Sequence, residues 1–261
     1  MENKTLLLII DPQVDFISGS LPVKTAEECM KRLSCSIDES PGRFSDILVT
    51  LDSHLPGHLS FRSSWNVKSW EDERDITEIT PEMIGQTVKP KYEFLNQEDI
   101  AEYINRLPGK QLDLWPDHCV IGTPGHSIWP RLKESLDKWS SKSKKPWEIL
   151  MKGNRPDREM YSAILCDGEV FQGLTCTPGI DSNLIESYDT IYIAGIAKDF
   201  CVAATVKDLI EQFGPEIQDR LVFIDDCMPQ IIDWNASCDI YDEAIEKHGA
   251  SRVTSNFFCL L

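Results

Sequence analysis

Short, almost continuously apolar segments recur along this chain of 261 residues, and helical patterns separate them. A strand whose residues are nearly all apolar must be covered on both faces, which is typical of a parallel sheet between helices. We therefore predict a three-layer α/β/α fold with a mostly parallel sheet of roughly six strands. The expected strands are 5–10, 46–51, 148–151, 190–194 and 221–224, with a sixth at 252–258, and the expected helices are 27–33, 128–139, 200–213 and 240–248.

The charge of the chain limits the partners it can have. Lys and Arg number 26 and Asp and Glu number 43, which gives a formal net charge of −17. A protein this acidic is repelled by phosphate backbones, so we expect no nucleic acid partner. The early apolar run 6–10 is too short for a signal peptide or a membrane span, and the nine cysteines contain no CxxC pair. We therefore expect a cytoplasmic protein with reduced thiols and no membrane contact, and the sequence leaves open whether it forms a homo-oligomer.

Four of the predicted strands lead into side chains that can do chemistry. The first strand is followed by Asp11, the second by Asp52 and His54, and the third by Lys152. The fourth runs through a turn into a helix that carries Cys201. Ligands of open α/β sheets bind beyond the carboxyl ends of the strands, so we expect these side chains to meet there.

Cys201 is the candidate nucleophile. It lies near the start of a predicted helix, where free N–H groups and partial positive charge stabilise a thiolate and an oxyanion. Lys152 would favour the thiolate electrostatically, and Asp11 would take the thiol proton and return it to a leaving amine. Each residue also has a purely structural explanation. Cys201 packs a helix onto the sheet, Lys152 is a solvated strand end, and Asp11 is a turn residue before Pro12. Their expected convergence at one edge favours catalysis.

A metal site is a second candidate. Asp52 and His54 are two residues apart, so both side chains point to the same face if the strand continues through them. His58 follows His54 by four residues, and His118 lies far along the chain. A carboxylate with imidazoles suits Zn²⁺, Fe²⁺ or Mn²⁺. The spacing alone is a weak signal, because Asp-x-His pairs arise by chance and nothing ties His118 to this pair.

Taken together, the sequence motifs resemble the nicotinamidase branch of the isochorismatase-like cysteine hydrolases. Matching blocks follow in the family's order over residues 5–226. They are DPQVDFISGSLPV at 11–23, DSH at 52–54, WPDHCV at 115–120, GTPG at 122–125, KG at 152–153, YSA at 161–163 and GIAKDFCV at 195–202.

The resemblance implies a catalytic triad of Asp11, Lys152 and Cys201. It implies an oxyanion hole made by the N–H groups of Ala197 and Cys201, with a cis peptide bond between Ile196 and Ala197. The implied reaction is the hydrolysis of a small amide, nicotinamide, to nicotinic acid and ammonia through a thioester.

The resemblance also implies one divalent metal ion, zinc first, with iron or manganese as alternatives. Its ligands would be Asp52, His54 and His118, with His58 as a less certain fourth, and it would receive the pyridine nitrogen. The residues Phe16, Trp115 and Tyr161 match positions that surround the substrate ring.

One long segment departs from the compact relatives. We predict a single domain, 1–261, with an insertion at about 60–112 that contains a helix at 98–107. Three interpretations of this insertion stay open: an enlarged surface loop, a lid over the pocket or a contact between subunits. It leads directly into Trp115, so it can change the shape of the substrate pocket.

Two other functions stay open at this point. One is a sister cysteine hydrolase acting on another small amide, a carbamoyl or a ureido substrate, and metal content would separate it from the first hypothesis. The other is a non-catalytic scaffold, which would have no reason to retain an acid, an amine and a thiol together.

Overall fold

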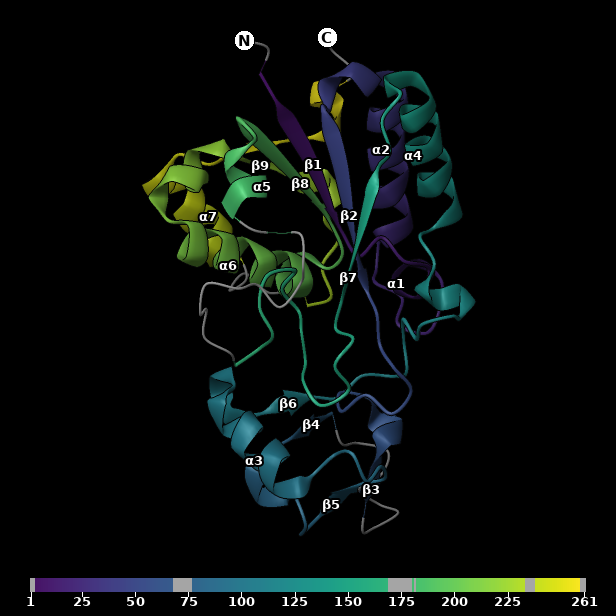
Figure 1. Ribbon diagram of the computed structural model, residues 1–261, viewed down its shortest axis with the longest axis vertical. Helices are drawn as coiled ribbons and strands as arrows, with labels where there is room; N and C mark the ends of the chain where they lie inside the picture. The colour runs from purple at the N-terminus through teal and green to yellow at the C-terminus, as the bar shows by residue number, and fades with distance from the viewer. Residues whose placement is uncertain (1–2, 68–76, 169–179, 181, 233–237, 259–261) are drawn as a thin grey trace.

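The computed structural model describes residues 3–67, 77–168, 180, 182–232 and 238–258 (Figure 1). Its centre is a six-stranded sheet in the order β10-β9-β8-β1-β2-β7. Every neighbouring pair in this sheet is parallel. The strands are β1 (Thr5–Ile10), β2 (Asp46–Asp52), β7 (Glu148–Lys152), β8 (Thr190–Gly195), β9 (Leu221–Ile224) and β10 (Ser251–Val253).

Helices cover both faces of the sheet, as Figure 1 shows. The strand β1 explains the two layers, because its side chains alternate between them. Leu7 and Ile9 pack into the cluster formed with α2 and α4, and Leu6, Leu8 and Ile10 pack into the cluster formed with α6 and α7. The helices are α1 (Val14–Ile17), α2 (Ala26–Glu39) and α4 (Pro130–Ser143) on one side and α5 (Ser182–Glu186), α6 (Ala203–Phe213) and α7 (Cys238–His248) on the other.

The three-layer fold and the five main strand predictions are confirmed. Each of the four expected helices is present, although α2 continues to Glu39. The prediction of a strand over 252–258 is wrong beyond Val253, where a short 3₁₀ helix, Ser255–Phe258, follows. The N–H and the hydroxyl of Ser255 both donate to the Asp226 carboxylate, at 2.7 and 2.6 Å, so the chain turns away from the sheet at this residue.

The part of the chain between β2 and α4 forms a small structure of its own beside the carboxyl edge of the sheet (Figure 1). It contains the strand pairs β3–β5 and β4–β6, both antiparallel, and the helix α3. Asn96 caps α3 by accepting hydrogen bonds from the N–H groups of Glu98 and Asp99, which confirms the helix predicted at 98–107. The bounds are β3 (Trp65–Val67), β4 (Glu78–Ile79), β5 (Val88–Pro90), α3 (Gln97–Arg106) and β6 (Leu112–Asp113).

This insertion has a separate hydrophobic cluster. Its members are Leu59, Trp65, Ile79, Val88, Leu95, Ile100, Tyr103, Ile104, Leu107, Leu112 and Leu114. Nowhere in the described ranges is there a helix with the length and hydropathy that a membrane span requires.

Candidate active site

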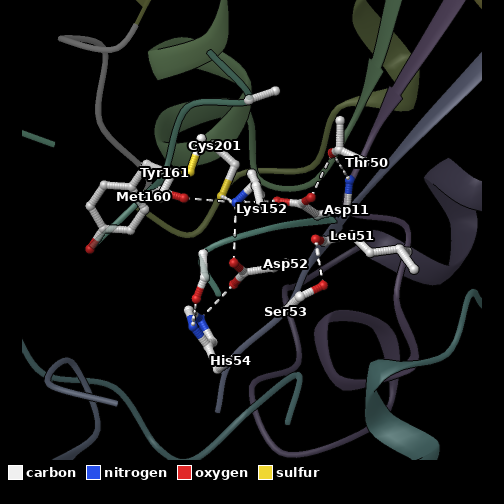
Figure 2. Close-up of polar contacts among 12 residues, drawn as sticks. Asp11, Thr50, Leu51, Asp52, Ser53, His54, Lys152, Met160, Tyr161 and Cys201 are labelled. Atoms are coloured by element: carbon white, nitrogen blue, oxygen red, sulfur yellow. Dashed lines mark hydrogen bonds and ion pairs between the residues drawn. The ribbon is translucent and has the colours of Figure 1, made fainter. Parts of the chain in front are cut away.

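Lys152 lies between Asp11 and Cys201 at the carboxyl edge of the sheet (Figure 2). Its Nζ is 2.9 Å from Asp11 Oδ2 and 3.6 Å from Cys201 Sγ. The same ammonium donates to the Met160 carbonyl at 3.0 Å and lies 3.3 Å from Asp52 Oδ1. The three residues predicted as a triad are buried, with 0%, 1% and 6% of Asp11, Lys152 and Cys201 exposed. The structure therefore brings together an acid, an amine and a thiol that lie far apart in the sequence.

The backbone aims the Asp11 carboxylate into this cluster. Asp11 directly follows β1 and has φ +46°, a left-handed conformation that is uncommon outside glycine and often marks functional sites. Its N–H donates to Thr50 Oγ1 at 3.1 Å, and the Thr50 hydroxyl donates to Asp11 Oδ1 at 2.6 Å. Sequence analysis missed Thr50, because a threonine inside a buried strand carries no motif.

Cys201 reaches the cluster from a short π-helix, Lys198–Val202, which precedes α6. The peptide bond between Ile196 and Ala197 is cis, as the resemblance predicted. The Ala197 carbonyl accepts hydrogen bonds from the N–H groups of Phe200 and Val202, which closes the turn around the cysteine. Ala197 and Cys201 both line the small cavity beside this turn.

The electrostatics of the cluster differ from the sequence-based expectation at Cys201. Burial raises the pKa of the Cys201 thiol well above its usual value, and the carboxylates of Asp11 and Asp52 raise it too, although Lys152 lowers it. Burial also raises the pKa of Asp11, which Lys152 lowers and Asp52 raises. Burial would lower the pKa of Lys152, but the two carboxylates outweigh it and raise that pKa well above its usual value. Cys201 therefore rests as a thiol beside an ammonium, rather than as the expected thiolate.

A second group of side chains converges next to the triad. Asp52 Oδ2 lies 2.9 Å from His54 Nε2 and 3.4 Å from His118 Nε2. One ligand atom from each residue lies within 4.8 Å of the others, and all three residues are buried. His54 Nδ1 faces the Gly153 carbonyl at 3.2 Å and His118 Nδ1 faces the Pro116 carbonyl at 2.7 Å, so both rings turn Nε2 toward Asp52. Two imidazole nitrogens and one carboxylate oxygen fit a divalent Zn, Fe or Mn ion.

The charge states support the same interpretation. Burial would raise the pKa of Asp52, but His54 and Lys152 lower it well below its usual value, so this carboxylate stays ionised. Burial would lower the pKa of His54, but the Asp52 carboxylate outweighs it and raises that pKa, so without a metal the imidazole compensates the charge of Asp52. A bound cation would take over that role.

His58 lies beside this group, and it forms a second possible ligand group with His54 and Glu159, with one ligand atom from each within 4.8 Å of the others. Its ring centroid is 4.1 Å from that of His54. Its Nδ1 lies 2.8 Å from Ser60 Oγ and its Nε2 lies 2.9 Å from the Arg158 carbonyl, so both ring nitrogens have partners. Burial lowers the pKa of His58 well below its usual value, and the neighbouring His54 lowers it further. His58 thus supports His54 as a neutral ring in this arrangement.

Glu159 is a residue of the site that the sequence analysis did not identify. It is only 3% exposed, and it offers an oxygen within 4.8 Å of ligand atoms of His54 and His58. It also lines the cavity that contains Cys201. Glu159 lies in a segment without a helical or strand pattern, and its place before the YSA motif was the available signal.

The cavity between the two groups is lined by aromatic side chains. Phe16, Trp115 and Tyr161, which the resemblance places around a substrate ring, all line it together with Phe200. The ring of Phe16 is 5.4 Å from His118, and the ring of Trp115 is 5.2 Å from Phe200. The volume open to the centre of a water molecule in this cavity is about 20 Å³, enough for roughly one ordered water.

Comparisons with known proteins agree with this geometry. The chain is 31% identical over 210 residues to the nicotinamidase of Saccharomyces cerevisiae, a match that covers 78% of this chain and 81% of that protein. It is 29% identical over 259 residues to the nicotinamidase of Acinetobacter baylyi, which covers 97% of this chain and 94% of that protein. No protein-family model matches the chain.

Solved structures show the same fold. A nicotinamidase and pyrazinamidase of Acinetobacter baumannii superposes with a TM-score of 0.64 at 22% identity, covering 98% of this chain and 99% of that one. The pyrazinamidase of Pyrococcus horikoshii in complex with zinc superposes with a TM-score of 0.58 at 21% identity, covering 96% of this chain and 99% of that one.

The parallel sheet, the cluster at its carboxyl edge and these relatives define the class of protein, a hydrolase acting on the carbon–nitrogen bond of amides. Within that class, the chain belongs to the nicotinamidase family of the isochorismatase-like hydrolases.

Proposed function

We propose that this protein hydrolyses nicotinamide to nicotinic acid and ammonia, with Cys201 as the nucleophile and a thioester intermediate. The observation that carries the proposal is the contact of the Lys152 ammonium with both Asp11 and Cys201, at 2.9 and 3.6 Å, inside an aromatic cavity. The substrate follows from the relatives, which are named nicotinamidases.

Asp11 is the general base and acid of the proposed reaction. The Lys152 ammonium contacts both the Asp11 carboxylate, at 2.9 Å, and Cys201 Sγ, at 3.6 Å, so Asp11 would be close enough to accept the thiol proton when Sγ attacks the carboxamide carbon. Because burial raises the pKa of Asp11, its carboxyl can hold this proton until the carbon–nitrogen bond breaks, and then pass it to the departing ammonia.

The backbone supplies the electrostatic part of catalysis in this proposal. Ala197 and Cys201 line the cavity, and their N–H groups would hold the negatively charged oxygen of the tetrahedral intermediate. Lys152 would balance the negative charge that forms when the thiol gives up its proton. In the second half of the reaction, Asp11 would take a proton from water, which attacks the thioester carbon. As the carbon–sulfur bond breaks and nicotinic acid leaves, Asp11 would return this proton to the Cys201 sulfur.

Asp52, His54 and His118 would hold one divalent metal ion, with Glu159 beside them. Zinc is our first choice, with iron or manganese as alternatives, since the donor set suits all three. When bound, the ion would supply a Lewis-acid contact for the pyridine nitrogen of the substrate. Phe16 and Trp115 would pack against the ring and exclude water from it.

The experiment is an ammonia-release assay on purified protein with measured metal content, using nicotinamide and a panel of other small amides. Nicotinamide is expected to be the best substrate, and acid quenching during turnover should trap a mass adduct on Cys201. Cys201→Ala should lose both turnover and adduct, whereas Cys35→Ala, which alters an exposed thiol, should lose neither. Turnover by Cys201→Ala would overturn the covalent mechanism, and a clear preference for a carbamoyl or ureido substrate would overturn the choice of nicotinamide.

Metal removal tests the other half of the proposal. Chelation is expected to weaken nicotinamide binding by at least tenfold, and added Zn²⁺, Fe²⁺ or Mn²⁺ should restore it. The fold should survive, because Asp52 and His54 already pair at 2.9 Å and keep their places. Calorimetry of nicotinamide binding to the metal-free protein checks this, and tight binding there would contradict a role for metal in holding the ring.

We also propose that the protein acts in the cytoplasm. The cysteines that the structure describes as free thiols include Cys201, Cys119, Cys29 and Cys227. A reducing compartment would keep the nucleophile in its active thiol form.

A further inference from the structure

A carboxylate in the turn that carries Cys201 binds a loop that lies against the substrate cavity. Asp199 belongs to the π-helix Lys198–Val202 and precedes Cys201 by two residues. Its Oδ1 accepts a hydrogen bond from the Ile231 N–H at 3.0 Å. Its Oδ2 accepts hydrogen bonds from the N–H groups of Ile231 and Ile232, at 3.0 and 2.7 Å. Both carboxylate oxygens therefore hold the backbone of a segment that follows β9 in the chain.

Ile231 lies where the cavity meets solvent. It lines the cavity that contains Cys201, together with Phe200 of the same turn. Among the described residues that line this cavity, Ile231 is the most exposed, at 38%, whereas Phe16 and His118 are buried, at 6% and 4%. The apolar Ile231 side chain therefore narrows the mouth of the cavity, the opening through which a ligand reaches the cysteine.

The turn around the cysteine has other contacts that do not involve the Asp199 side chain. The Lys198 N–H donates to the Pro229 carbonyl at 2.8 Å. The hydroxyl of Tyr241, a fully buried residue of α7, donates to the Lys198 carbonyl at 2.7 Å. Loss of the Asp199 carboxylate should therefore free the loop at Ile231 while the nucleophile keeps its place.

We infer that Asp199 is a positioning residue that holds Ile231 at the mouth of the cavity, so that Ile231 limits the size of the molecule that can reach Cys201. The identity of the substrate rests on the proposed function, but the width of the mouth does not. A carboxylate suits this task because it accepts hydrogen bonds from two successive N–H groups, and hydrogen bonds to a charged acceptor are stronger than neutral ones.

Alkylation of Cys201 by reagents of two sizes tests the inference without turnover. The rate with a bulky maleimide, divided by the rate with iodoacetamide, reports the width of the mouth, because a change in thiol reactivity affects both rates. Mass spectrometry of the Cys201 peptide keeps the exposed Cys35 out of the measurement. Asp199→Ala and Ile231→Ala should each raise this ratio about five- to tenfold. Asp199→Asn keeps one acceptor oxygen and should raise it less than Asp199→Ala does.

Matched controls and a double variant separate positioning from a general loss of structure. Asp189→Ala removes another carboxylate that accepts a backbone N–H, that of Lys4 at 2.8 Å. Ile149→Ala truncates another exposed isoleucine, which does not line the cavity. Both controls should leave the alkylation ratio unchanged. Because Asp199 acts through Ile231, the double variant Asp199→Ala/Ile231→Ala should match Ile231→Ala alone.

Steady-state kinetics connect the mouth of the cavity to the proposed function. The wild type should favour nicotinamide over nicotinamides that carry a bulky ring substituent, and Asp199→Ala should reduce this preference in kcat/KM about three- to tenfold. The kcat for nicotinamide should change less than about twofold, since the cysteine keeps its place. If the wild type does not hydrolyse nicotinamide, the proposed function fails, while the alkylation ratios still decide the inference.

The outcomes that would overturn the inference are specific. They are an alkylation ratio that stays at the wild-type value in Asp199→Ala or in Ile231→Ala, additive effects in the double variant, and a fall in kcat with an unchanged preference among the amides. If Asp199→Ala does not fold, Asp199→Asn decides: a raised ratio supports the inference, and the wild-type ratio overturns it.

Discussion

At the scale of single residues, Lys152 holds the site together. Its buried ammonium contacts Asp11 of the triad and Asp52 of the candidate metal group, at 2.9 and 3.3 Å. Burying a charge is costly unless partners compensate it, and here each partner lies at the end of a different strand. The same cation therefore compensates two buried carboxylates and fixes the distance between the triad and the metal group.

We expect Lys152→Met to reduce kcat by about 10²–10⁴-fold, because Asp11 would then keep its proton and could not accept one from the thiol. It should also destabilise the fold by about 3–5 kcal/mol, the usual effect of removing one partner from a buried pair. Ammonia release and urea unfolding measure the two effects. Lys133→Met is the control, since it breaks an exposed ion pair with Asp137 and should change little. Full activity in Lys152→Met would contradict a role for the ammonium.

The protonation state of Cys201 gives a second prediction. Because burial raises its pKa well above the usual value of 9.0, the metal-free protein should carry no Cys201 thiolate near neutral pH. The sign follows from the direction of the shift: the thiolate forms only as pH rises through the raised pKa. The thiolate absorbance of the wild type minus that of Cys201→Ala should stay flat up to about pH 9 and increase only above it. A thiolate difference at pH 7 would show that Lys152 and the helix start dominate after all.

At the scale of elements, the end of β7 organises both halves of the site. Lys152 is its last residue, and Gly153 follows with φ +73°. The Gly153 carbonyl faces His54, while its Cα lies so close to the metal group that a Cβ would be 2.8 Å from Asp52 Oδ1 and 3.2 Å from His54 Cε1. The Lys-Gly pair of the sequence motif therefore has a physical reason: the lysine supplies charge and the glycine leaves room for metal ligands.

Gly153→Ala should lower metal affinity and activity by about 10–100-fold, because the added methyl group displaces Asp52 and the His54 ring. Metal titration followed by the ammonia assay checks this. Gly214→Ala is a matched control, since Gly214 also has a left-handed φ, +74°, but a Cβ there would meet nothing within 4 Å. Both variants should lose about 1 kcal/mol of stability from the backbone conformation, and only Gly153→Ala should lose metal. Equal metal affinity in the two variants would contradict the argument.

At the scale of the whole molecule, the insertion stands over the carboxyl edge and contacts the site at several points. The Tyr103 hydroxyl of α3 accepts a hydrogen bond from the Glu159 N–H at 2.9 Å. The Arg158 guanidinium lies over the Tyr103 ring at 4.7 Å. The segment that carries Glu159 and Tyr161 is therefore supported by both the central sheet and the insertion, although the insertion has its own hydrophobic cluster.

Unfolding of Ile104→Ala tests whether 1–261 is a single domain with an insertion at about 60–112. Ile104 is fully buried in the cluster of the insertion, so its truncation should cost about 2–5 kcal/mol. We expect one cooperative transition shifted to lower denaturant, with activity lost in the same transition. Leu132→Ala, a comparable truncation under α4, should shift the same single transition. A separate early transition in Ile104→Ala alone would make the insertion a domain of its own.

The sequence by itself determined the layers of the fold and the order of its chemistry. Strands such as 5–10 must be covered on both faces because they are apolar throughout, and parallel strands bring their carboxyl ends to one edge. That reasoning, with the family motifs, located Asp11, Asp52, Lys152 and Cys201 before any contact was known.

The tertiary structure decided the burial, the charged neighbours and the hydrogen bonds of those residues. Only the packing of the chain shows that Cys201 is buried near carboxylates, that the His58 ring contacts Ser60 and Arg158, and that Glu159 lines the cavity. The physical reason is that local patterns describe which face a residue occupies, whereas the pKa of a side chain and its hydrogen bonds depend on neighbours brought together from distant parts of the chain.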